Sequence, residues 1–305
     1  MIQKYHSGNL VWVDLISPSV DEIRQIVSEY NIHPLVAHEL NIPTLRPKVD
    51  LYDNFIYLIL HFPSLRKNVD GGQDDQEMDF IVGKNFIITT RYGEVDALLA
   101  LSKSLEVEAI LEKGAKGAHA GFIFFEMLKK IYESILHKTE RIKDKLASIE
   151  DEIFKGREKE MVKKLSEVSR ELLDFKRATS LHDEILESFE VASIKFFGEE
   201  FRFYLRSLIG EYVKVENSIR NMLEFMSELR ETNNALLTTK QNQITQALTV
   251  IAFITLPLSI ITSWFQIGAK GTPFINLPNS FWIIAGGEVL LGLFFYAFFK
   301  MKKWL

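Results

Sequence analysis

A long uncharged stretch near the carboxyl end constrains the fold of this chain more than any other feature. No charged residue occurs between Lys240 and Lys270. As a helix, residues 244–265 would extend about 33 Å, which matches the hydrocarbon core of a bilayer. A second apolar segment, residues 281–299, follows a short loop and precedes a basic tail. We therefore expect residues 241–305 to form a transmembrane hairpin with a short outer loop.

One face of the first membrane segment carries mostly small or polar side chains. They recur at spacings of three and four residues, which places them on one side of a helix. We call this set the stripe: Asn242, Thr245, Thr249, Ala252, Leu256, Ser259 and Ser263. Such a face contacts other helices or water rather than lipid. Two interpretations are open: close helix packing, or a pore in which hydroxyls and amides replace part of an ion's water shell.

The rest of the composition excludes several classes of protein. The chain has 305 residues with a formal net charge of −5, which gives no reason to expect nucleic-acid binding. It has no cysteine, so disulfides and thiolate metal sites are excluded. The first residues lack the basic start and apolar core of a signal peptide. We therefore expect the chain to enter the membrane first near residue 244, after a large soluble region.

Residues 1–115 predict a small α/β domain. Alternating apolar residues and β-branched side chains indicate strands, and a serine before an amphipathic stretch indicates a helix start. In chain order, the expected elements are a strand at 10–16, a capped helix at 20–30, a short helix at 33–40, a strand in the second half of 46–62, a hairpin at 78–91 with its turn at 83–85, and a helix at 95–105.

Residues 116–240 predict long charged helices. The first covers 121–154 and the second 158 to about 194, with Gly156 at the break between them. A third begins near Glu199 and meets no proline before Pro257, so it can continue into the membrane segment. Such a stalk would transmit movement of the soluble region to the stripe.

The distribution of lysines predicts the orientation of the hairpin. Lysines precede the first span and follow the second, whereas the loop between the two spans carries only one. The flanking residues are Lys240, Lys300, Lys302 and Lys303. The positive-inside rule then places both termini in the cytoplasm of a multi-pass cell-membrane protein.

Several of these segments resemble, in their order and spacing, the CorA family of magnesium and cobalt transporters. They are RPKVDLYDNFIYLIL at 46–60, IVGKNFIITTR at 81–91, TTKQNQITQALTVIAFITLPLSII at 238–261 and the lysine-rich tail. The resemblance implies an α+β cytoplasmic domain, a long helical stalk and two transmembrane helices, assembled in a bilayer as a funnel-shaped homopentamer. It also implies divalent metal cations as partners, with no resident cofactor beyond Mg²⁺ as a transported or regulatory ion.

The resemblance also assigns places to the stripe residues. Five copies of the first membrane helix would line a pore, with Asn242 at its cytoplasmic mouth and Thr245, Thr249, Leu256 and Ser259 following toward the outside. A ring of Leu256 could form an apolar constriction that blocks conduction by dewetting. Ordinary helix packing remains the alternative role for that leucine.

The chain departs from the family at the outer pore mouth, where the family carries Gly-Met-Asn. Here the aligned residues are Phe265, Gln266, Ile267 and Gly268. The amide of Gln266 could form a substitute ring, or it could merely end the helix in water. The outer loop carries Lys270 and no acidic residue, so its field disfavours divalent cations.

Acidic residues supply the remaining candidates. Glu288 lies in the second membrane segment, where an ionisable group is a functional candidate by default. It could stay protonated or hydrogen-bond to a Thr or Ser of the first membrane helix. Low-specificity candidates for a regulatory cation site in the soluble region are Asp70, Asp74, Asp75, Glu77 and Glu211, since carboxylates bind hard cations. A solvated acidic surface is the alternative.

No residue pattern in the sequence predicts an enzyme, because a phosphate loop and a histidine pair at metal spacing are both missing. We expect a cation channel or transporter with an altered outer motif. The alternatives are a non-conducting membrane sensor or scaffold, and a channel of monovalent selectivity.

Overall fold

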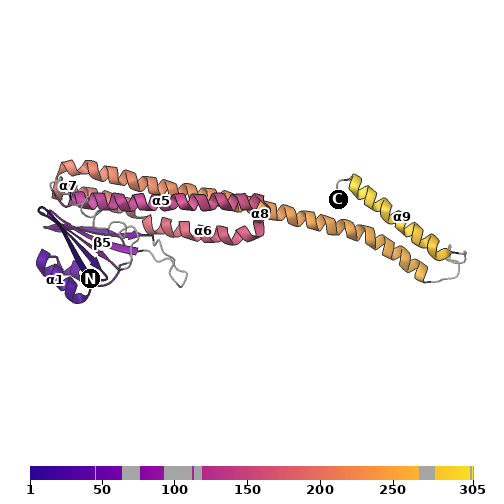
Figure 1. Ribbon diagram of the computed structural model, residues 1–305, viewed down its shortest axis with the longest axis horizontal. Helices are drawn as coiled ribbons and strands as arrows, with labels where there is room; N and C mark the ends of the chain where they lie inside the picture. Colours follow the sequence, from indigo (N-terminus) through magenta and orange to yellow (C-terminus); the bar gives the residue numbers. More distant parts are fainter. Residues whose placement is uncertain are drawn as a thin grey trace. The chain divides into compact units, whose positions relative to one another are not determined.

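The computed structural model of the chain describes residues 1–44, 46–63, 76–92, 112, 119–267, 279–302 and 304. Two compact units make up the chain, Met1–Arg230 and Glu231–Leu305 (Figure 1). The expected helix at 95–105 lies outside the described residues. The division into regions 1–115, 116–240 and 241–305 stays a prediction.

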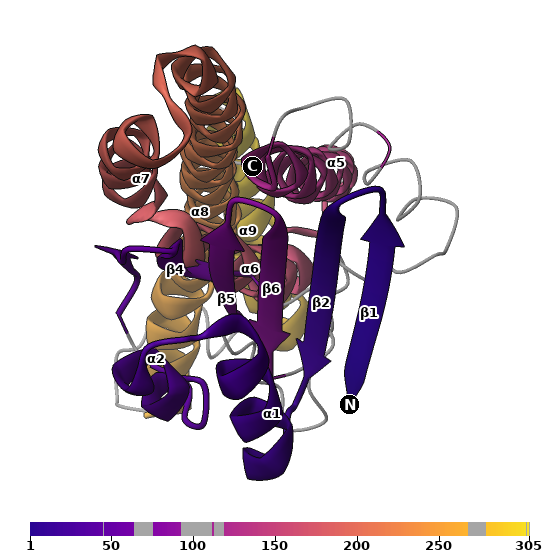
Figure 2. The same ribbon diagram turned by 90° about the vertical axis from the view of Figure 1, so that its left-hand side faces the viewer.

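A six-stranded mixed sheet organises the first unit. Its strands are β1 (Ile2–Ser7), β2 (Leu10–Ile16), β3 (Lys48–Leu51), β4 (Phe55–Phe62), β5 (Gln76–Gly83) and β6 (Phe86–Arg91). They follow the order β1-β2-β6-β5-β4-β3, and Figure 2 shows β1, β2, β6 and β5 side by side. β2 and β6 pair in parallel, and the other neighbours pair antiparallel. The predicted strands are confirmed, and the two edge strands, β1 and β3, were not predicted from the sequence.

Both faces of the sheet are covered, because alternate side chains of a strand point to opposite faces. On one face, Ile56 and Leu58 of β4 join a core with Phe124 of α5 (Gly121–Phe154). On the other, Tyr57 and Ile59 join a core with Ile23 of α1 (Val20–Tyr30) and with residues of α2 (Pro34–Glu39). The central strands therefore carry buried apolar side chains on both faces.

The prediction of one continuous helix from 158 to about 194 is wrong. The structure divides this stretch into α6 (Glu158–Thr179) and α7 (His182–Phe197). The Ser180 hydroxyl donates to the Arg177 carbonyl at 3.0 Å and so satisfies an end carbonyl of α6. His182 is fully buried, and its ring nitrogens lie 2.9 Å from the Tyr132 hydroxyl and 2.8 Å from the His61 carbonyl oxygen. These contacts with other elements, rather than a local signal, set the break.

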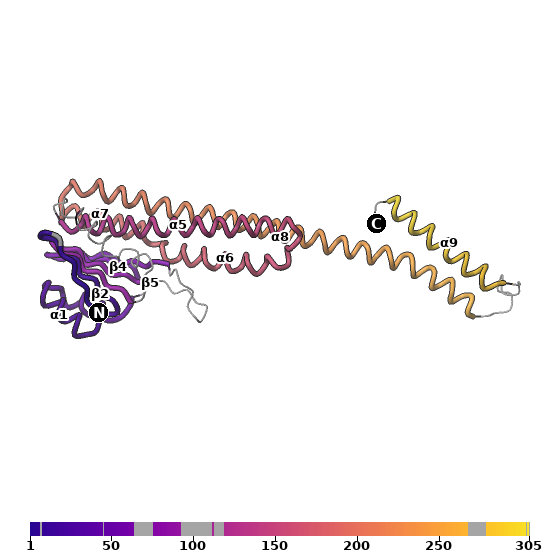
Figure 3. Tube along the Cα trace, in the orientation of Figure 1, coloured from indigo at the N-terminus to yellow at the C-terminus, as the bar shows by residue number. Residues whose placement is uncertain are grey.

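The third expected helix is confirmed. A 3-10 turn at Glu199–Phe201 leads into α8 (Arg202–Gln266), which is 65 residues long and contains residues of both units. In the second unit, α8 is followed by α9 (Ser280–Met301) (Figure 3). Both helices carry stretches long and apolar enough to cross a membrane. Almost none of their apolar side chains are buried within one chain, which suits lipid as the surrounding solvent.

Candidate functional site

The stripe lies on the face of α8 opposite to α9. In this segment, the partly or fully covered side chains of α8 share the other face. They are Ala247, Val250, Ile254, Pro257, Leu258, Ile261, Thr262 and Phe265. Contacts identify α9 as their neighbour: Thr262 is 2.7 Å from Glu288, and Gly292 lies against Leu258. At 3.6 residues per turn, the stripe and the covered set point about 180° apart. Every stripe side chain is exposed within one chain, including Leu256 at 62%.

The hydroxyl groups of the stripe already donate their protons within their own helix. Thr245 donates to the Gln241 carbonyl at 2.9 Å, Thr249 to the Thr245 carbonyl at 2.7 Å, and Ser259 to the Thr255 carbonyl at 2.9 Å. A hydroxyl that has donated its one proton offers only lone pairs to its surroundings. The stripe therefore presents oxygen acceptors, which suit a cation or the protons of its water shell.

The candidate outer pore mouth lies at the carboxyl end of α8. The helix ends at Gln266, which is exposed, and Ile267 follows with 72% of its surface accessible. Gly268, the third residue of the candidate outer mouth, lies outside the described residues, as does Lys270. The role of Gln266 as a substitute ring stays a prediction.

The acidic candidates of the soluble region do not come together as one site in the part of the chain that is described. Asp70, Asp74 and Asp75 lie outside the described residues. Glu211 accepts a hydrogen bond from Lys214 at 2.8 Å, so a lysine of its own helix already neutralises it. Glu77 is buried in β5, where it accepts from the Thr44 amide and lies 3.6 Å from His61. Their role as cation ligands stays a prediction.

Asp79, two residues after Glu77 on the same face of β5, was not anticipated from the sequence. It is fully buried, and the Tyr92 hydroxyl donates to it at 3.2 Å. Burial, and then the neighbouring Glu77 carboxylate, raise the pKa of Asp79 well above its usual range. Among the described residues, no group of three or more His, Asp or Glu side chains could hold a metal ion.

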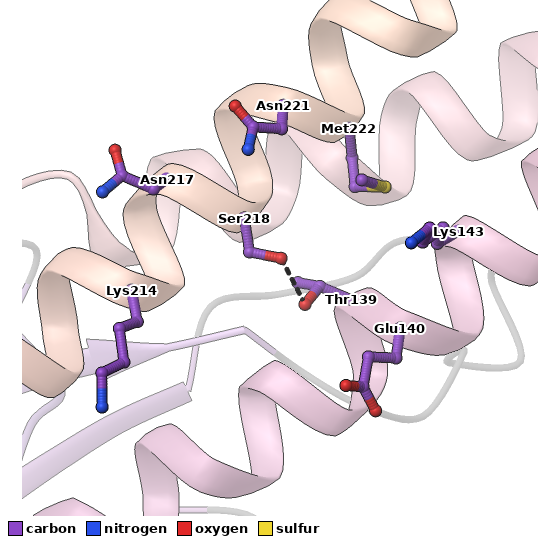
Figure 4. A pocket seen from close by; sticks show the side chains of 8 residues that line it. All are labelled: Thr139, Glu140, Lys143, Lys214, Asn217, Ser218, Asn221 and Met222. Atoms are coloured by element: carbon purple, nitrogen blue, oxygen red, sulfur yellow. Dashed lines mark hydrogen bonds between the residues drawn. The ribbon is translucent and has the colours of Figure 1, made fainter.

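A groove between α5 and α8 in the first unit has a volume of 410 Å³. Figure 4 shows its lining: Thr139, Glu140, Lys143, Lys214, Asn217, Ser218, Asn221 and Met222. The Ser218 hydroxyl donates to the Thr139 hydroxyl across it at 2.8 Å. Its two lysines outnumber its one carboxylate, so this groove does not suit a cation.

The second unit contains one further polar contact between its helices. The hydroxyl oxygen of Thr262 lies 2.7 Å from a carboxyl oxygen of Glu288 and 2.9 Å from the carbonyl oxygen of Leu258. This confirms the sequence-based alternative in which Glu288 hydrogen-bonds to a hydroxyl of the first membrane helix. Thr262 lies on the covered face of α8, so the contact is outside the stripe.

Comparisons with known proteins match nearly the whole chain. A family model described as "CorA-like Mg2+ transporter protein" matches residues 7–302. The cobalt/magnesium transport protein CorA of Thermotoga maritima is 21% identical over 301 residues, covering 98% of this chain and 84% of the relative. The protein of the same name from Methanocaldococcus jannaschii is 19% identical over 307 residues, covering 99% and 93%.

The fold comparison agrees. A structure of the complete CorA magnesium transporter from Methanocaldococcus jannaschii has a TM-score of 0.82 at 18% identity and covers 99% of this chain and 93% of that chain. A structure of the full-length CmaX protein has a TM-score of 0.71 at 16% identity, covering 95% and 88%. These likenesses confirm the expected fold class: an α+β domain, a long helix and two candidate membrane helices.

Proposed function

Because the chain belongs to the CorA-like Mg²⁺ transporter family, we propose that it carries a divalent metal cation across a membrane, down the ion's electrochemical gradient. The chain needs no reaction centre for this role, since the electrochemical gradient supplies the driving force. It needs a polar path through the bilayer.

The observation that carries the proposal is the placement of the stripe opposite α9. A polar face exposed to lipid is unfavourable, and α9 does not cover it. Copies of the same helix arranged around an axis would bring these faces together and leave water between them. A homopentamer, as the family resemblance implies, provides that arrangement. Asn242 would then lie at the cytoplasmic mouth, with Thr245, Thr249, Leu256 and Ser259 farther along the path.

The acceptor oxygens of the stripe favour a cation that keeps much of its water. Mg²⁺ dehydrates reluctantly, so contacts through its water shell suit it better than direct ligation. At the outer mouth, Gln266 replaces the amide that the family signature would supply. Its side chain can accept hydrogen bonds from the waters of a hydrated ion.

The lysines that precede the first span and follow the second support an orientation with both termini in the cytoplasm of a cell-membrane protein. The soluble first unit would then face the cytoplasm, and the segment between α8 and α9 would face the outside.

Flux through liposomes that contain the purified protein tests the proposal. Mg²⁺, Co²⁺ and Na⁺ entry should be measured for the wild type, Asn242→Ala and Gln266→Ala. Loss of one net hydrogen bond of about 1 kcal/mol lowers occupancy about fivefold, so we expect Mg²⁺ flux to fall by that factor or more in Asn242→Ala. Gln243→Ala is the matched control, since Gln243 is the next exposed amide and lies off the stripe.

Three results would distinguish the possibilities. Mg²⁺ flux that responds to Asn242 and not to Gln243 supports the proposal. Na⁺ flux without Mg²⁺ flux would indicate a channel of monovalent selectivity, which the loss of the family's outer motif also permits. Absence of flux for every ion would indicate a non-conducting sensor or scaffold.

A further inference from the structure

Contacts join α8 and α9 at successive levels of the membrane segment. Two of these levels are apolar and one is polar: the rings of Phe253 and Phe299 have centroids 6.4 Å apart, Leu258 lies against Gly292, and the Thr262 hydroxyl donates to a carboxyl oxygen of Glu288 at 2.7 Å. In this order the partners advance along α8 and go back along α9, so the two helices run antiparallel. The polar contact is the one nearest to Gln266, at the candidate outer mouth.

Pro257 lies between the first of these contacts and the other two. Proline has no N–H, so the carbonyl of Phe253 lacks its usual helical donor and α8 can bend at this point. The part of α8 beyond Pro257 is therefore held less firmly by its own helix, and contacts with α9 fix its direction. Thr262 lies little more than one turn past the proline.

The hydrogen bond between Thr262 and Glu288 forms whether or not the carboxyl group carries a proton, because Thr262 is the donor. The hydroxyl also lies 2.9 Å from the Leu258 carbonyl oxygen, but that oxygen is the helical acceptor of the Thr262 backbone N–H. Donation to Glu288 therefore leaves the Leu258 carbonyl with a partner. Loss of this bond would instead leave a half-buried carboxyl group among apolar side chains, which is costly.

Gln266 lies one turn beyond Thr262. It is also seven residues after Ser259 and three after Ser263, so helical spacing places it on the side of α8 that carries the outer end of the stripe. A contact that fixes the direction and rotation of this last part of α8 therefore also fixes the direction of the Gln266 amide.

We infer that Glu288 is a positioning residue for the outer mouth. By accepting the hydrogen bond of Thr262, it holds the part of α8 beyond the bend and keeps the Gln266 amide directed at the ion path. Its effect on transport rests on the proposed function, in which that amide accepts hydrogen bonds from the water shell of the ion. Glu288 itself lies outside the path, because Thr262 belongs to the covered face of α8.

The motion of a spin label tests the positioning without any measurement of flux. The chain has no cysteine, so a label can be attached at Ile267→Cys alone, next to Gln266 and at a side chain that is 72% exposed. In the full-length protein in liposomes, electron paramagnetic resonance should report a more mobile label when Glu288→Leu removes the acceptor. Thr262→Val should have the same effect without any change in α9.

Two variants control for this readout. Glu288→Gln should keep the wild-type motion, because its amide oxygen still accepts from Thr262. Thr255→Val should also keep it, since Thr255 is exposed and donates to the Ile251 carbonyl of its own helix at 3.0 Å. Equal label motion in the wild type, Glu288→Leu and Thr262→Val would overturn the inference.

Mg²⁺ flux tests whether the positioning acts through Gln266. Glu288→Leu and Gln266→Ala should each lower the flux about fivefold, which corresponds to one net hydrogen bond of about 1 kcal/mol. The double variant should lower it little further, because both changes remove the same directed amide. Losses that multiply in the double variant would overturn the inference, since a general packing role of Glu288 would act independently of Gln266.

Two further outcomes separate this inference from its rivals. A loss of flux in Glu288→Gln as large as in Glu288→Leu would overturn it, because the charge of Glu288 rather than its hydrogen bond would then matter. If the label responds as expected but the wild type passes no ion, the proposed transport function is refuted and the positioning by Glu288 stands.

Discussion

The two units of this protein satisfy their polar groups in opposite ways. In the first unit, buried polar side chains find partners on other elements: Arg91 of β6 donates to Asp14 of β2 at 2.8 Å, and both side chains are 3% exposed. In the second unit, hydroxyls such as those of Thr245 and Thr249 bond to carbonyls of their own helix. The first unit therefore depends on tertiary contacts within one chain. The hydroxyls of the membrane helices bond mostly within their own helix, apart from the contact between Thr262 and Glu288, and these helices depend on their surroundings.

Apolar side chains show the same difference. On α5, residues such as Ile135, Ile142 and Leu146 form a buried face, and charged residues cover the rest. In the membrane segment of α8, apolar side chains point in most directions, and Ile244 and Leu248 are each 62% exposed. A helix that is apolar on most sides requires lipid or other copies around it. Sequence changes should consequently alter the stability of the first unit strongly and that of the second unit weakly.

The largest effect is expected for Arg91→Met. The substitution leaves the Asp14 carboxylate buried beside Thr89 without a cation, which costs about 3–5 kcal/mol of unfolding free energy. Denaturant unfolding in detergent, followed by near-ultraviolet circular dichroism of the buried Trp12, measures it. A second change, Asp14→Leu, added to Arg91→Met should restore much of the loss, because it removes the orphaned charge.

An exposed ion pair provides the control for that experiment. Lys145 donates to Glu171 at 2.9 Å, and its side chain is 53% exposed. Lys145→Met should change the free energy of unfolding by no more than about 1 kcal/mol. Equal losses in Arg91→Met and Lys145→Met would contradict the view that the first unit depends on its buried pairs.

Acid should weaken the first unit through His182. Burial lowers the pKa of His182 to about 4 from its usual 6.5, because the charged ring loses its hydration, and this outweighs the hydrogen bond to the His61 carbonyl, which raises the pKa. Between these two values the unfolded chain binds a proton that the native state does not. The free energy of unfolding should therefore fall as the pH drops from 6.5 to 4, by up to about 3 kcal/mol.

Two variants isolate this contribution. His182→Gln should unfold with a pH dependence that is smaller by one proton over that window, whatever its absolute stability. His137→Gln should keep the wild-type slope, since His137 is exposed on α5. Identical slopes in all three proteins would show that His182 does not titrate as its burial requires.

The same contrast explains which features the sequence could predict. The start of α1 was predictable because Ser19 and Glu22 cap the helix with each other, and the hairpin was predictable from Gly83 and its neighbours. The break before His182 was not, because its partners are 50 and 121 residues away along the chain. Local sequence signals thus predict individual helices and strands, whereas the break before His182 depends on contacts between elements.

In the candidate site, too, features set by local sequence were predictable and features set by packing between elements were not. The stripe follows from helical periodicity alone, so its residues could be named in advance. Its placement opposite α9 depends on how the two membrane helices pack, which a single-helix pattern does not contain. Asp79 was missed because its position in the sequence of β5 gives no indication that Glu77 and Tyr92 interact with it in the fold.

The smallest effect is expected for threonines that bond to their own helix in the membrane segment. Thr245→Val and Thr255→Val each remove one such bond and replace the hydroxyl by a methyl group of similar size. The carbonyl that loses the hydroxyl keeps its helical N–H partner, so no polar group is orphaned, and the unfolding free energy should change by less than about 1 kcal/mol. The two variants should differ in flux, because Thr245 belongs to the stripe and Thr255 does not. A fall in Mg²⁺ flux in Thr245→Val alone, with both proteins equally stable in detergent, would assign the stripe to the ion path; equal flux would assign it to helix packing.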